Sequence, residues 1–312
     1  MTDLLVSTLT QGLVYALISF GVYITYSILD FPDLGVDGTF PLGAAVTAVL
    51  LTRGVNAWLT LPIAMAVGAL AGLFTGFIHV RLKVRNLLAG IITMTALFSI
   101  NLQIAGSNLT IDRSTDTIFT SAPVLALMGG ASTMVRKLVV SFILVLAVKL
   151  ALDLYLKTKS GLLLRAVGDN AALVTTLAKD CGRVKILGLV IANALVSLAG
   201  CVVCHEQRSF SATMGTGQLV YGLAAVIIGI SAMRFFSDSR AANRLRRTRG
   251  LRWLSTPAGT TAVILGSILY KLCIQAALSM GLPANMMKLI TAVLFLLVLV
   301  LSGRKGEAII HA

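Results

Sequence analysis

The chain has 312 residues, of which 57% are hydrophobic and only 12% are charged. This composition leaves too little charge to cover a soluble surface, and it supplies more apolar side chain than one soluble core needs. A formal net charge of +14 would suit nucleic-acid binding, but the basic residues lie in short segments between apolar runs, so no nucleic-acid partner is expected. The sequence predicts an all-α integral membrane protein with a single transmembrane domain, residues 1–312.

Apolar runs of about 18 residues or more recur along the chain, which is the length that a helix needs to cross a bilayer. We expect about nine spans. The second, residues 38–52, is short and follows a segment rich in Asp, Gly and Pro, so a re-entrant or broken helix is as compatible as a plain span. The expected spans lie at roughly residues 7–29, 38–52, 57–80, 87–106, 138–157, 184–206, 215–233, 257–280 and 284–302.

The segment before the second span carries Asp30, Asp33 and Asp37 among glycines and prolines. Their spacing does not match a calcium loop, and no His or Glu completes a site, so we expect no metal. Irregular backbone at membrane depth is tolerated where protein or water surrounds it. We therefore expect this segment to lie against a translocation path.

Glycines recur at every fourth position of the third expected span, at Gly68, Gly72 and Gly76. Glycines at this spacing leave one helix face without side chains, so that a neighbouring backbone can approach closely. The pattern predicts tight helix packing, which a membrane bundle of any function can use.

Basic residues are concentrated after the third, fifth, seventh and ninth expected spans. Because short loops rich in Lys and Arg are retained in the cytoplasm, we expect the N-terminus outside and the C-terminus inside. Residues 158–183 then lie on the cytoplasmic side, where their amphipathic, helix-compatible pattern suits a docking helix. The arginine-rich loop 234–253 lies on the same side, either as a retention signal, which we favour, or as a site for anionic lipid headgroups.

The string from Cys201 through Cys204 to His205 matches the CxxCH pattern of covalent haem attachment. It lies at the end of a continuous apolar helix, whereas haem attachment needs a reachable loop and an enclosing fold. We therefore interpret the two thiols as packing residues and expect no cofactor on this chain.

Lys271 falls deep in the eighth expected span, where an unpaired ammonium costs roughly 2.5 to 3.5 kcal/mol on insertion scales. It should face the bundle interior or a wet cavity, and a structural partner and a pathway role are equally open. The amide side chains inside spans favour hydrogen bonding between helices over ligand contact. These amides are Asn101, Gln103, Asn193 and Gln275.

The sequence contains no GxxxxGK[ST] phosphate loop, and the glycines at 215, 217 and 222 do not have the spacing of a dinucleotide fingerprint. We therefore expect that the chain is not an enzyme. If ATP drives its function, a different chain must bind and hydrolyse it.

Four stretches of the chain resemble the permeases of ATP-binding-cassette (ABC) importers of the branched-chain amino acid and ribose class. The likeness is greater to the subfamily paired with tryptophan/tyrosine-type binding proteins. These stretches cover most of the chain and are residues 13–46, 160–185, 214–231 and 268–301.

The resemblance implies the type II importer fold in the bacterial inner membrane. It implies a permease homodimer that works on two ATPase subunits and receives a small polar solute from an extracytoplasmic substrate-binding protein. The subfamily likeness points toward an amino acid with an aromatic side chain. Coupling to the ATPase is implied for Gly161, Arg165, Gly168, Asp169, Asn170, Thr176, Leu177 and Gly182. A place on the translocation path is implied for Asp33, Asp37, Gly38, Thr39 and Gly43, to which we add Lys271 because of its depth.

A secondary transporter or channel that needs no ATPase is the alternative, since broken helices and an intramembrane lysine serve such proteins equally well. Ion-coupled carriers usually carry several acidic residues inside spans, whereas the acids here cluster at loops. We therefore favour an importer that works by alternating access, in which segment 158–183 moves the spans around the path.

Overall fold

The computed structural model of the chain describes residues 2–130, 132–170, 174–175, 180–238, 259–281, 286, 289–297 and 300. Within these residues, six helices are long and apolar enough to cross a membrane. They are α1 (Thr2–Val22) continued by η1 (Tyr23–Ile28), α3 (Ala57–Val80), α4 (Asn86–Ala105), α6 (Thr133–Lys157), α9 (Cys181–Gln207) and α12 (Gly259–Ser279). The expected all-α membrane protein is confirmed.

The expected total of about nine spans is not confirmed. Two of the expected spans form shorter apolar helices, α2 (Val36–Thr52) and the part of α10 (Gln218–Asp238) that ends at Met233. The ninth expected span, residues 284–302, lies partly outside the described residues. The short elements are α5 (Ala122–Met128), α7 (Lys159–Asp169) and the antiparallel strands β1 (Asn108–Thr110) and β2 (Ser209–Ser211).

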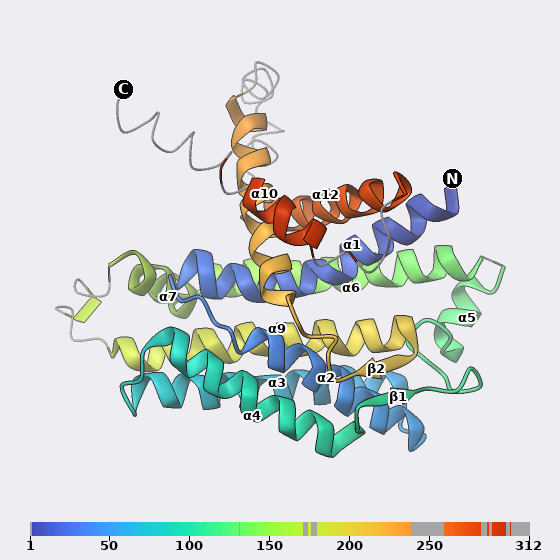
Figure 1. Ribbon diagram of the computed structural model, residues 1–312, viewed down its shortest axis with the longest axis horizontal. Coiled ribbons are helices and arrows are strands. Elements are labelled where there is room, and N and C mark those ends of the chain that lie inside the picture. Colours follow the sequence, from blue (N-terminus) through green and yellow to red (C-terminus); the bar gives the residue numbers. More distant parts are fainter. Residues whose placement is uncertain are drawn as a thin grey trace.

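Helix α9 lies in the middle of the bundle and packs against α1, α2 and α3 (Figure 1). Helix α6 packs on α1, and α4 packs on α2 and α3. In Figure 1, α10 runs across the direction that α1, α6 and α9 share, and α12 packs on α1 and α10. Helix α7 lies at one end of the bundle and α5 lies at the opposite end.

The glycines of the third span face α9. A methyl group added at Gly68 would overlap Ser197 and the carbonyl of Asn193, and one added at Gly72 would overlap the carbonyl of Leu189. Gly76 continues the same face against Ile186. The two backbones can approach this closely because no side chain stands between them.

The backbone between the first span and α2 is irregular. α1 ends in the π-helical turn η1, and residues 29–35 contain no helix. Asp30 adopts a left-handed backbone with φ of 51°. α2 begins part-way along α9 (Figure 1), and Gly43 in α2 lies directly against the backbone of Ser197. The irregular backbone coincides with the Asp-, Gly- and Pro-rich segment, for which a broken or re-entrant helix and a plain span were equally compatible.

Pro41 lies inside α2 and has no N–H to donate to the carbonyl of Asp37, four residues earlier. Gly215 approaches this same carbonyl and the Pro41 ring so closely that an added methyl group would overlap both. The first turn of α2 is therefore weakened within the helix and covered from outside by the chain around Gly215.

The strands tie the α5 end of the bundle together. Arg208, which follows α9 in a left-handed conformation with φ of 54°, donates to the carbonyls of Asp112 at 2.8 Å and Thr115 at 2.9 Å. These bonds hold the loop after β1 against the end of α9. Asp112 is exposed on this loop, which therefore forms an ordered surface.

The CxxCH residues lie on the last turns of α9. Cys201, Cys204 and His205 are buried, and both thiols are free. His205 Nε2 lies 2.8 Å from the hydroxyl of Thr60, which also lies 3.6 Å from the Cys201 sulfur. These contacts are packing and hydrogen bonding between α9 and α3.

Candidate functional site

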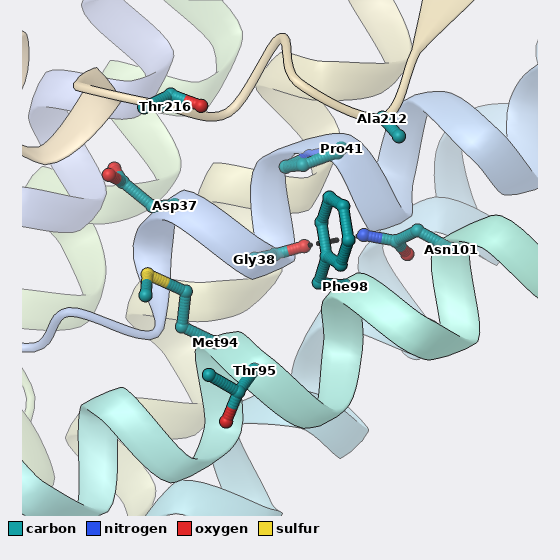
Figure 2. Close-up of a pocket in the computed structure, with 9 residues that line it drawn as sticks. All are labelled: Asp37, Gly38, Pro41, Met94, Thr95, Phe98, Asn101, Ala212 and Thr216. Carbon is teal, nitrogen blue, oxygen red and sulfur yellow. Dashed lines mark hydrogen bonds between the residues drawn. The ribbon is translucent and has the colours of Figure 1, made fainter. Parts of the chain in front are cut away.

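A pocket of about 270 Å³ lies between α2, α4 and the turn that joins β2 to α10 (Figure 2). Its walls are mostly apolar, and Asp37 is the one charged residue that lines it. The lining residues are Asp37, Gly38, Pro41, Met94, Thr95, Phe98, Asn101, Ala212 and Thr216. A mostly apolar cavity with a few polar groups is the usual form of a small-molecule site.

Asp37 joins the first turn of α2 to the start of α10. Its Oδ2 accepts a hydrogen bond from the Gly217 amide at 3.0 Å, and its Oδ1 accepts one from the Leu219 amide at 2.8 Å. A carboxylate here satisfies backbone donors that a helix start leaves without intrahelical partners, and it complements the positive end of the helix dipole. Asp37 therefore caps a helix that is distant in sequence.

Asn101 meets α2 from the opposite wall. Its Nδ2 donates to the carbonyl of Gly38 at 3.1 Å, as Figure 2 shows. Because a carbonyl can only accept, this bond fixes the orientation of the Asn101 amide. The side chain is fully buried, yet its Oδ1 has no hydrogen-bond partner. The pocket wall thus contains a buried acceptor without a donor.

Asp33 lies in a separate, closed network. Its Oδ1 accepts from the Gly35 amide at 2.8 Å, and its Oδ2 accepts from Asn193 Nδ2 at 2.9 Å. The Thr39 hydroxyl donates to Asn193 Oδ1 at 2.8 Å. Asp33, Thr39 and Asn193 are completely buried, and none of them lines the pocket. This network fixes the turn before α2 onto the middle of α9.

The remaining residues expected on the path also lie elsewhere. Gly43 is a packing contact between α2 and α9. The Lys271 ammonium lies 4.3 Å from the centroid of the Tyr15 ring and 5.8 Å from that of Tyr221, an arrangement that stabilises a cation by its interaction with aromatic faces. Of the six residues expected on the path, Asp37 and Gly38 line the pocket.

The residues of α4 that line the pocket were not identified from the sequence. Met94 and Phe98 read as ordinary apolar residues of a span, and nothing in their spacing distinguishes them from lipid-facing residues. Asn101 carried a signal, since an amide in an apolar span needs a partner. Its Nδ2 makes the expected hydrogen bond between helices, to the Gly38 carbonyl, whereas its Oδ1 has no hydrogen-bond partner.

The segment expected to couple to an ATPase begins with α7. Thr158 caps this helix by accepting from the Gly161 amide at 3.2 Å. One face of α7 is buried: a methyl group at Gly168 would overlap the carbonyl of Ile28, the last residue of η1. Nearby, Leu164 and Leu29 meet over Gly188 of α9. α7 is therefore packed directly against the end of η1, where the first span passes into the irregular backbone.

The opposite face of α7 is open. Arg165, Asp169 and the following Asn170 are exposed. Gly182, at the start of α9, packs against Val80 at the end of α3. Thr176 and Leu177 lie outside the described residues, as does the arginine-rich loop from residue 239 onward.

Comparison with known proteins identifies this class of molecule. A family model described as the permease component of branched-chain amino acid transport systems matches residues 4–299. The chain belongs to this permease family. It is a multi-pass bacterial inner-membrane permease of an ABC importer for a small solute, as the sequence predicted. Members of this family are not themselves catalytic, and they work with ATPase and substrate-binding subunits.

Relatives of this permease have several solutes in their names. A tyrosine transport system permease protein of Clostridioides difficile is 35% identical over 292 residues, 94% of this chain and 89% of the relative. A ribose import permease protein of Haemophilus influenzae is 25% identical over 73% of this chain and 68% of the relative. A probable branched-chain amino acid transport permease protein of Methanocaldococcus jannaschii is 29% identical over 68% and 69%, respectively. No solved structure matches.

Proposed function

We propose that this permease moves an amino acid, with an aromatic side chain favoured, into the cell. The observation that carries the proposal is the pocket between α2 and α4, in which one carboxylate and one buried amide oxygen lie beside the apolar surfaces of Met94 and Phe98. Hydrogen-bond acceptors beside an apolar wall suit a solute that has an ammonium group and an apolar side chain. The similarity to a tyrosine transport permease supports the same class.

The translocation path runs past the start of α2, and Asp37 and Gly38 are its contact residues in this proposal. Asp33, Thr39 and Gly43 then support the path by holding α2 in place. Lys271, in α12, contacts the rings of Tyr15 and Tyr221 and so helps to hold α1 and α10 beside the path. Their contacts with the pocket or with the helices that form it support this proposal.

Coupling to ATP hydrolysis goes through α7 in this proposal. The exposed residues Arg165 and Asp169 meet a groove of the ATPase subunit, and Gly168 transmits the movement to the end of η1 through its contact with the Ile28 carbonyl. Residues 29–35 connect η1 to α2, so a shift of α7 reaches the pocket wall within one short segment. This is a lever that alternates access to the path.

The proposed assembly is a permease homodimer with the N-terminus outside the cell and the C-terminus in the cytoplasm. ATP binds to the ATPase subunits in this assembly. The α7 end then faces the cytoplasm, and the loop held by Arg208 faces the substrate-binding protein.

The experiment that tests this function is solute uptake into vesicles that contain the permease, its ATPase subunits and its binding protein. We expect uptake of labelled tyrosine or tryptophan only when all subunits and ATP are present. Asp169→Asn and Arg165→Ala should reduce uptake about tenfold or more while ATP hydrolysis continues, because an interface contact is lost without loss of the fold. Asp30→Asn is the matched control for Asp169→Asn, since it makes the same chemical change at another exposed aspartate. Uptake that needs no ATPase would instead identify a secondary transporter.

A further inference from the structure

The turn that covers the pocket has internal hydrogen bonds and few bonds to the rest of the bundle. Residues 212–217, here called the strap, join β2 to α10, and Ala212 and Thr216 of the strap line the pocket. Within and beside the strap, the Met214 amide donates to the Ser211 carbonyl at 3.1 Å, and the Gln218 amide donates to the Gly215 carbonyl at 3.1 Å. The Ala212 amide donates to the Ser107 carbonyl at 2.9 Å, which anchors the β2 end of the strap, so a movement of the strap is a swing of residues 213–217 about that end.

At its α10 end, the strap is bound to α2 by the side chain of Asp37. The Asp37 carboxylate accepts from the Gly217 amide at 3.0 Å and from the Leu219 amide at 2.8 Å, so both of its oxygens are occupied. Gly217 has φ of 89°, a conformation that residues with a Cβ rarely adopt. Gly215 completes the contact by lying against the Asp37 carbonyl and Pro41. In Figure 2, the Asp37 carboxylate points toward the strap.

The groups that remain in the pocket are mainly acceptors. Asp37 is the charged residue of the lining, and the buried Asn101 Oδ1 lacks a donor. The Gly38 carbonyl between them already accepts from Asn101 Nδ2. If the strap and the first turn of α10 moved away together with no ligand present, the Asp37 carboxylate would lose the Gly217 and Leu219 amides beside an apolar wall, which is costly for a charged group. A ligand with a cationic donor would remove that cost.

We propose that Asp37 exchanges partners during transport. In the arrangement seen here it holds the strap closed, and when the strap lifts it accepts hydrogen bonds from an ammonium group of the solute, with Asn101 Oδ1 as the second acceptor. This inference rests on the proposed function and adds to it a specificity-determining residue and the solute group that it recognises. A solute without an ammonium group leaves the carboxylate unpaired, so the pocket discriminates against such solutes by the cost of opening.

The first test measures whether Asp37 holds the strap. Ala212 is 6% exposed and lines the pocket, so Ala212→Cys provides a shielded thiol in the strap. The background carries Cys181→Ser and Cys273→Ser, because Cys201 and Cys204 are buried. In membranes that contain the full chain, Asp37→Asn should make a maleimide react about tenfold faster with Cys at 212, because a charge-assisted bond to the strap is lost.

The matched control is Asp30→Asn, the same chemical change at an exposed aspartate of the same segment. It should leave the labelling rate unchanged. Leu219→Pro is a second way to weaken the contact, because it removes a donor while Asp37 stays intact, in a helical turn that tolerates proline. Equal labelling rates in the parent, Asp37→Asn and Leu219→Pro chains would overturn the proposal that Asp37 holds the strap.

The second test measures recognition of the ammonium group. Saturation-transfer NMR on the purified chain compares 2-phenylethylammonium with 3-phenylpropionate, which is similar in size and opposite in charge. We expect a signal for the ammonium compound that falls at least about fivefold in Asp37→Asn and is unchanged in Asp30→Asn. Equal signals from both compounds, or a signal that does not depend on Asp37, would overturn the assignment. Neither test requires an ATPase, so negative results in both would contradict the role of Asp37 and leave the importer function unaffected. Uptake without an ATPase would contradict the importer function and leave the role of Asp37 unaffected.

Discussion

Asp33 and Asp37 belong to the same short segment, yet they occupy opposite kinds of environment. Asp33 is fully buried, and its carboxylate is saturated by Gly35 and Asn193 inside the bundle. Asp37 lines the pocket, and its carboxylate holds the start of α10. The difference teaches that one acidic residue can fix the irregular segment onto α9 while its neighbour on the next turn joins α2 to α10 at the wall of a pocket.

Asp33→Ala should have the largest effect on stability. It leaves one N–H of the Asn193 side chain and the Gly35 amide without their acceptor in a buried site, while the bond from Asn193 to the Leu189 carbonyl remains, so we expect the free energy of unfolding to fall by about 3 kcal/mol. The midpoint of thermal unfolding in detergent measures this loss. A midpoint equal to that of the parent would remove the distinction between the two aspartates.

Asp37→Asn should have a smaller effect on stability and a larger one on transport. One of the two amide donors at the start of α10 loses a good acceptor, which costs about 1 to 2 kcal/mol. Initial rates of ATP-driven uptake should fall by much more than the purified, folded fraction does. Parallel loss of both quantities would indicate that Asp37 is structural, as Asp33 is.

Thr39→Val tests the Asp33 network from its other end. The change keeps the shape of the side chain and removes the hydroxyl that donates to Asn193 Oδ1, so a loss of about 1 kcal/mol is expected. Unfolding midpoints of Asp33→Ala, Thr39→Val and the double variant form a cycle. Coupling should appear, because both residues bond to the same Asn193; strict additivity would show two independent sites.

Asp30→Asn should have the smallest effect of the series. Asp30 is exposed and left-handed, and asparagine tolerates that conformation well. We expect a change in unfolding free energy within about 0.5 kcal/mol and normal uptake. A large loss of uptake would give the third aspartate of the segment a role that its surroundings do not explain.

Sequence patterns predicted the irregular backbone before α2 because prolines and glycines act locally on the chain. They also predicted that α3 presents a glycine face, which lies on α9. The different environments of Asp33 and Asp37 could not be predicted, since both belong to one Gly- and Pro-rich segment and differ in which distant element passes beside them. Asn193 meets one of them and Gly217 meets the other, and both contacts span more than a hundred residues.

The pocket itself depends on tertiary structure in the same way. Met94 and Phe98 become a wall because α4 packs on α2, and the cover over the pocket exists because α10 starts at Asp37. Hydropathy describes how apolar a span is, and it does not tell which of its faces meets another helix. Hydropathy does not fix the number of crossings for a related reason, since α2 and the apolar part of α10 that ends at Met233 are shorter than a full span.

Pro41 has an energetic consequence for any movement of α2. Since Pro41 has no N–H to donate to the Asp37 carbonyl, unwinding the first turn breaks one i→i−4 hydrogen bond fewer than it would in an uninterrupted helix. That missing bond corresponds to about 1 kcal/mol that need not be supplied in each transport cycle. The turn that carries Asp37 can thus rearrange at low cost, while the rest of α2 stays rigid against α9.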